Sequence, residues 1–69
     1  MKTEFLSLIV KEVAAHFRPN PQLATFKAVR SVCMDAMIDH YGRVVCASHR
    51  TLDVVDDLAE SVLDHLGLN

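Results

Sequence analysis

Hydrophobic residues recur at intervals of three and four along most of this chain, the spacing that places side chains on one face of an α-helix. In the first segment the repeat follows the heptad positions Leu6, Val10, Val13 and Phe17. In the last segment the same spacing runs through Leu52, Val55, Ala59, Val62 and Leu66. The pattern predicts three helices, at about residues 3–17, 21–41 and 51–66.

The central helix is predicted from its two ends. Asn20 followed by Pro21 is typical of an N-cap and a first helical residue, and Gly42 suits the left-handed position that follows a helix. At 1.5 Å per residue, such a helix is roughly 30 Å long. Its expected apolar face contains Phe26, Val29, Cys33, Ala36 and Met37.

Two polar residues interrupt that apolar face. Arg30 falls between Phe26 and Met37, and His40 falls beside Cys33. The Arg30 stem can lie along the apolar surface with its guanidinium in water, or the charge can be paired at a subunit or partner interface. The sequence leaves both interpretations open.

The segments between the helices differ in character. Pro19 should end the first helix, because the residue before a proline is disfavoured in the α region, and the short corner to Pro21 predicts a hairpin of the first two helices. Residues 43–50 are expected to form a loop with partial helical character, and either Ser48 or Thr51 can cap the last helix. The predicted fold is all-α: a helical hairpin plus a third amphipathic helix.

Size and composition indicate how that fold is used. The 69 residues make a single domain, 1–69, and 51% of them are hydrophobic. A chain this short buries only ~60% of the surface that it exposes when unfolded, so we expect a homodimer that uses the heptad stripes of the first and last helices. The residues expected in the core or the dimer contact are Leu6, Val10, Val13, Phe17, Phe26, Cys33, Met37, Leu52, Val55, Val62 and Leu66.

The cellular setting is inferred from three further observations. Two cysteines are too few for the disulfide framework of a small secreted domain, and charges at Glu4, Lys11 and Glu12 interrupt any signal-peptide core. No apolar run approaches the ~18 residues of a membrane span. We therefore expect a cytoplasmic protein with no membrane contact.

Charge is distributed unevenly along the chain. Residues 1–50 have a net charge of +3, and residues 51–69 have five acids with no lysine or arginine. The acids of the last segment recur along one helical face, which is either solvated or a docking surface for a basic partner. This stripe consists of Asp53, Asp57, Glu60 and Asp64. A basic segment precedes the acidic stripe and contains His40, Arg43, His49 and Arg50. This segment either neutralises the acids of the last helix or binds an anionic partner.

Catalytic and metal-binding chemistry receives little support. The set Cys33, His40, Cys46 and His49 has the right donor types for zinc, but the first two lie two helical turns apart, about 10 Å. No phosphate-binding loop, nucleophile elbow or metalloprotease motif occurs. We expect no enzyme activity, no metal, no cofactor and no small-molecule substrate.

The function that these features favour is a non-catalytic small helical interaction protein that binds and modulates another protein, as an adaptor, anti-activator or inhibitor. The alternative is a small nucleic-acid-binding transcriptional regulator that uses a basic patch of Lys27, Arg30, Arg43 and Arg50. We expect a protein partner in preference to nucleic acid. The candidate contact residues are Arg30, His40, Tyr41, Arg43, His49, Arg50, Asp53, Asp57, Glu60 and Asp64.

Overall fold

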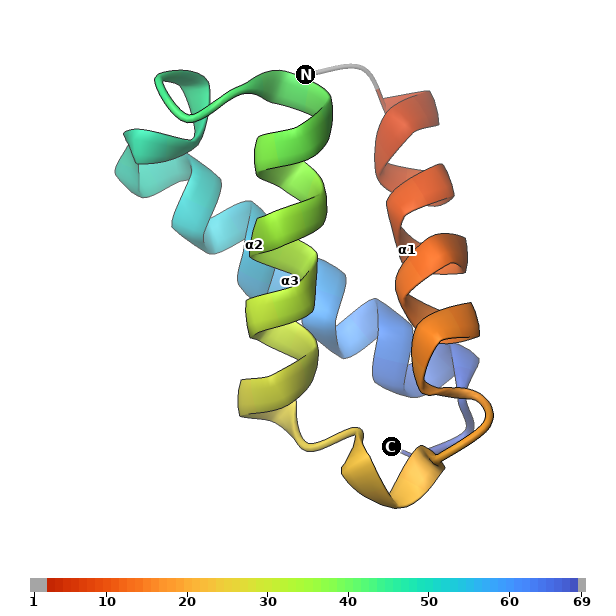
Figure 1. Ribbon diagram of the computed structural model, residues 1–69. Coiled ribbons are helices and arrows are strands. Elements are labelled where there is room, and N and C mark those ends of the chain that lie inside the picture. Colours follow the sequence, from red (N-terminus) through yellow and green to blue (C-terminus); the bar gives the residue numbers. More distant parts are fainter. Residues whose placement is uncertain (1–2, 69) are drawn as a thin grey trace.

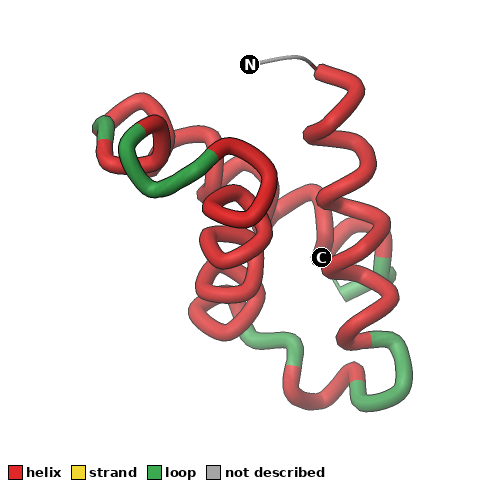
Figure 2. Tube along the Cα trace, turned by 45° about the horizontal axis from the view of Figure 1, so that its top comes forward, coloured by secondary structure: helices red, strands yellow, loops and turns green. Residues whose placement is uncertain are grey.

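Three α-helices joined by short 3-10 turns make up the computed structural model, which describes residues 3–68 (Figure 1). The helices are α1 (Thr3–Phe17), α2 (Phe26–Tyr41) and α3 (His49–His65), and the turns are η1 (Pro21–Leu23) and η2 (Val45–Ala47). The chain is 81% helical, and its described part contains no strand (Figure 2). The prediction of an all-α, three-helix protein is confirmed.

The helices are arranged as a hairpin crossed by a third helix. α1 and α2 run antiparallel, side by side, and α3 crosses behind both of them (Figure 1). α3 starts near the C-terminal end of α2 and finishes beneath the C-terminal end of α1. As a result α3 packs against both helices of the hairpin, and it separates from α1 toward the N-terminal end of α1.

The predicted start of the central helix, at Pro21, is wrong. Asn20 and Pro21 do open a helical turn, but that turn is the 3-10 segment η1, and the Asn20 side chain makes no capping hydrogen bond. Thr25 adopts an extended conformation, and its hydroxyl accepts a hydrogen bond from the Ala28 N–H at 3.2 Å. Because Thr25 caps a new helix, α2 begins at Phe26. Its 16 residues span about 24 Å, shorter than the roughly 30 Å predicted for a helix from Pro21.

The last helix starts two residues earlier than predicted. Ser48 is its N-cap: the Ser48 hydroxyl accepts from the Thr51 N–H at 3.3 Å and lies 3.0 Å from the Thr51 hydroxyl. This decides between the two caps that the sequence left open. α3 ends at His65, one residue before the predicted boundary, and Gly67 follows with a φ of 73°. The turn η2 confirms partial helical character in residues 43–50.

The hydrophobic core lies inside one chain. Each helix contributes residues of its apolar stripe, among them Val13 and Phe17, Cys33 and Met37, and Val55, Ala59 and Val62. Leu6, Val10 and Leu66 are partly buried against this core, whereas Phe26 and Leu52 are 43% and 38% exposed. The heptad stripes of α1 and α3 are therefore largely used within the fold, and a contact with a second copy needs other side chains.

Candidate functional site

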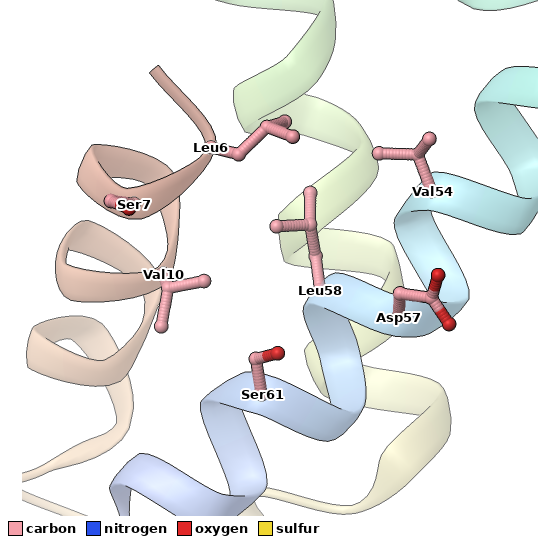
Figure 3. A pocket seen from close by; sticks show the side chains of 7 residues that line it. All are labelled: Leu6, Ser7, Val10, Val54, Asp57, Leu58 and Ser61. Carbon is pink, nitrogen blue, oxygen red and sulfur yellow. The ribbon is translucent and has the colours of Figure 1, made fainter. Parts of the chain in front are cut away.

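A groove of about 300 Å³ lies between α1 and α3. Each of the two helices contributes one short ridge to it (Figure 3). The lining residues are Leu6, Ser7 and Val10 from α1, and Val54, Asp57, Leu58 and Ser61 from α3.

The groove exists because the two helices cross. Near the C-terminal end of α1, Val13 and Phe17 are buried, but Leu6 and Val10 in its first half are only partly buried. There α3 lies further from α1 (Figure 1), and the side chains that line the groove between them are mostly apolar (Figure 3). Leu58 is 5% exposed and forms the deepest part of the α3 side. Ridges of side chains with such a gap between them are a surface into which a further ridge can pack.

The α3 wall of the groove is acidic. Asp57 lines the groove, and Asp53 and Asp64 lie one turn before it and two turns after it on the same ridge. All three side chains are exposed, as is Glu60. The acidic stripe predicted from the sequence therefore borders an apolar groove, a relationship that the sequence pattern did not reveal. Arg50, one turn before Val54, limits the acidic part of this ridge at its N-terminal end.

The α1 wall has a different polarity. Ser7 lines the groove, and Lys11 lies one helical turn further along the same ridge, exposed to solvent. The two walls therefore differ in charge, with carboxylates on α3 and an ammonium group on α1.

Arg30 is paired within the chain. Its Nε lies 2.5 Å from Oδ1 of Asp56, so the pair joins α2 to α3, and the two side chains are 39% and 48% exposed. At such exposure an ion pair contributes at most about 1 kcal/mol. The sequence left open whether Arg30 snorkels or is paired at an interface; here its partner belongs to the same chain. Asp56 was not among the candidate site residues, because its neighbour in space is distant in sequence.

His40 and Tyr41 brace the C-terminal end of α2 against α1. His40 Nε2 lies 3.4 Å from Oε2 of Glu12, and the rings of His40 and Tyr41 lie 6.2 and 6.0 Å from that of Phe5. His40 is exposed. His40 lies two turns after Cys33 in α2, and its ring faces Glu12 and Phe5 of α1. These residues serve the packing of two helices, and none of them lines the groove.

The basic residues do not form one patch. Lys27 is in the first turn of α2 and Arg43 lies just beyond its last turn, roughly 20 Å away along the helix axis. Arg30, between them, is held by Asp56. Arg43, His49 and Arg50 are exposed around η2 and the start of α3. The four-residue patch predicted for nucleic acid is thus divided between the two ends of α2.

The two thiols are buried and free. Cys33 is inaccessible and Cys46 is 7% exposed. Burial raises the pKa of the Cys33 thiol to about 11, which keeps it neutral and unreactive at physiological pH. Within residues 3–68, no three histidine, cysteine, aspartate or glutamate side chains converge on a point where they could hold a metal ion.

The helices were also compared with the requirements of a membrane span. Of those in the described part of the chain, none is both long enough and apolar enough to cross a bilayer.

Comparisons with known proteins found no match for this chain. No protein-family model matches the sequence, and neither a curated protein nor a solved structure is detectably similar to it. Function has to be inferred from the groove and the charges around it.

Sequence reasoning identified the acidic stripe but missed the apolar part of this site. Val54 and Leu58 are spaced by four, adjoin the α3 heptad stripe and line the groove opposite α1. They make the apolar face of α3 wider than one seam requires. That extra width is the signal that could have indicated a second apolar contact surface on α3.

Proposed function

We propose that this chain is a non-catalytic interaction protein that binds another protein through the groove between α1 and α3. One observation supports the proposal above all: a half-open apolar groove whose α3 wall contains Asp57, with Asp53 and Asp64 exposed on the same helix beside it. An adaptor, anti-activator or inhibitor needs such a surface, because it acts by occupying a site on its target. A reducing compartment such as the cytoplasm is the setting that we propose, given two free, buried thiols.

The apolar floor can supply affinity. Leu6, Val10 and Val54 are already mostly buried in the isolated chain, and each keeps only a minor part of its surface exposed. Full burial of a valine or leucine is worth about 1.5–3 kcal/mol, so covering what remains exposed of these three contributes on the order of 1–3 kcal/mol. The carboxylates at the rim add specificity and speed of association more than affinity. This combination of a central apolar contact and a polar rim is typical of protein interfaces.

A catalytic role has less support. The polar lining of the groove, among the described residues, consists of Ser7, Asp57 and Ser61 and includes no histidine or cysteine. Those two residue types most often supply a general base or a nucleophile.

Nucleic-acid binding is less well supported than protein binding, for an electrostatic reason. The groove is bordered by carboxylates, which repel phosphates, and the basic residues are divided between the two ends of α2. Retention of duplex DNA by the wild-type protein at low salt would favour that alternative over ours.

Self-association, which the composition predicts, is a separate proposal. It would use apolar side chains outside the groove, of which Leu8, Leu23 and Val44 are 49%, 59% and 91% exposed. Sedimentation equilibrium of the intact chain tests it, since a monomer at all concentrations contradicts it.

The experiment compares two matched charge reversals. Asp53→Lys/Asp57→Lys changes the α3 wall of the groove, and Asp35→Lys/Asp39→Lys makes the same change on exposed α2 positions with the same spacing. Each protein is used as bait in an extract of the native host, after circular dichroism has verified its helix content. A partner retained by the wild type and the α2 variant but lost by the α3 variant supports the proposal. Identical partners for both variants contradict it.

A further inference from the structure

We infer that the element bound in the groove is a cationic amphipathic α-helix of the partner protein. Its apolar stripe lies over the floor at Leu58, and its lysine and arginine side chains face the acidic wall of α3. This inference rests on the proposed function and specifies the chemistry of the partner. Shape, charge and the difference between the two walls each constrain it.

The shape of the groove suits a helix. Its α3 lining extends from Val54 to Ser61, about 10 Å along the helix axis, or two turns. The α1 lining faces it over Leu6 to Val10, about one turn of α1 (Figure 3). An apolar gap between two helical ridges accepts the side chains of a third helix at positions three and four residues apart.

The charge of the α3 wall selects a basic partner. Asp53 and Asp57 are one turn apart, and such like-charged pairs slightly destabilise a helix. Asp64 continues the ridge two turns after Asp57. Ammonium or guanidinium groups along one flank of a bound helix would offset the repulsion between these carboxylates and attract the partner to them. An acidic helix of the same hydrophobicity would be repelled.

The two walls together set how the helix is turned about its own axis. The α1 wall presents Ser7, with the exposed Lys11 one turn beyond it outside the lining, whereas the α3 wall presents the carboxylate of Asp57. The bound helix is therefore basic on the flank that faces α3, and neutral or acidic on the flank that faces α1. A peptide with lysine on both flanks should bind more weakly than one with lysine on a single flank.

Synthetic peptides provide the probe. Three helical peptides share one apolar stripe and differ on one flank, which contains lysine, glutamine or glutamate, and their binding to the intact chain is followed by fluorescence anisotropy. The lysine peptide should bind about tenfold more tightly than the glutamine peptide, and added salt should reduce that difference. The Asp53→Lys/Asp57→Lys variant should lose the preference, and the Asp35→Lys/Asp39→Lys variant should keep it.

A second variant tests the location without changing charge. Ser61→Phe fills the groove from an exposed position and should reduce binding of the lysine peptide at least about tenfold. Equal binding by wild type and Ser61→Phe, or no preference for the lysine peptide, overturns the inference. A wild-type dimer that Ser61→Phe dissociates also overturns it, because a second copy then occupies the groove. A host partner that needs the groove while no peptide binds would leave the proposed function standing without the cationic helix.

Discussion

Replacing Met37 by alanine tests whether the centre of the core has been located correctly. Met37 lies in the fourth turn of α2 and has no accessible surface, and it belongs to the cluster of buried side chains that joins all three helices. Truncation removes most of a large side chain from a site enclosed by helices on two sides. Methionine-to-alanine changes at such sites cost about 2–5 kcal/mol.

This loss is large compared with the total free energy of unfolding of the chain. At 0.05–0.15 kcal/mol per residue, a chain of 69 residues has a free energy of unfolding of roughly 3–10 kcal/mol. Met37→Ala therefore removes about a fifth or more of the free energy of unfolding, and a protein at the lower end of that range unfolds. Urea denaturation followed by far-ultraviolet circular dichroism measures the change.

Leu23→Ala provides the matched control, since it also truncates an aliphatic side chain, but one that is 59% exposed in η1. It should alter stability by no more than about 0.5 kcal/mol. A Met37→Ala protein that loses less than about 1 kcal/mol, or no more than Leu23→Ala does, would refute the placement of Met37 at the centre of the core.

Two further predictions concern the buried thiol and a helix cap. Burial raises the pKa of Cys33 from 9.0 to about 11, so the folded chain keeps a proton that the unfolded chain releases. This contribution to stability, about 2–3 kcal/mol, is complete below pH 9 and is lost as the pH rises through about 11; urea titrations should show that Cys33→Ala lacks it. Thr25→Ala should lower the free energy of unfolding by about 1 kcal/mol, and Thr25→Ser, which keeps the capping hydroxyl, should restore it.

In the proposed recognition, the apolar floor contributes affinity and the acidic residues contribute specificity. The apolar floor formed by Leu6, Val10, Val54 and Leu58 is permissive, because any hydrophobic ridge of suitable width can cover it. The carboxylates on α3 are selective, because they favour cations and repel anions over a range of about 8–10 Å at ordinary salt. Such a surface discriminates among partners by charge while it binds them by burial.

The two charged contacts between helices do not belong to the proposed binding surface. Arg30 with Asp56 and His40 with Glu12 connect α2 to its two neighbours. Both pairs are partly exposed, so each contributes little stability. Their consequence for binding is that these charged groups are engaged within the fold.

Much of the fold could be predicted from the sequence because its signals are local. α1 has the predicted bounds, since the heptad stripe and Pro19 lie within the segment itself. Gly42 has the positive φ, 87°, that its position after the central helix indicated. α2 was mispredicted at its start because two caps compete. Asn20–Pro21 is the more obvious one in sequence, and Thr25 is the one that forms the hydrogen bond.

The sequence by itself determined three amphipathic helices, their approximate limits, the buried character of Cys33 and the acidic face of α3. These depend on residues within a few positions of one another, where helical geometry links spacing to direction. Only the tertiary structure decided that Arg30 meets Asp56, 26 residues away, and that the acidic face borders an apolar groove. The angle at which α3 crosses the hairpin determines which half of α1 is covered. That angle results from the packing of all three helices at once, so no single segment of the sequence specifies it.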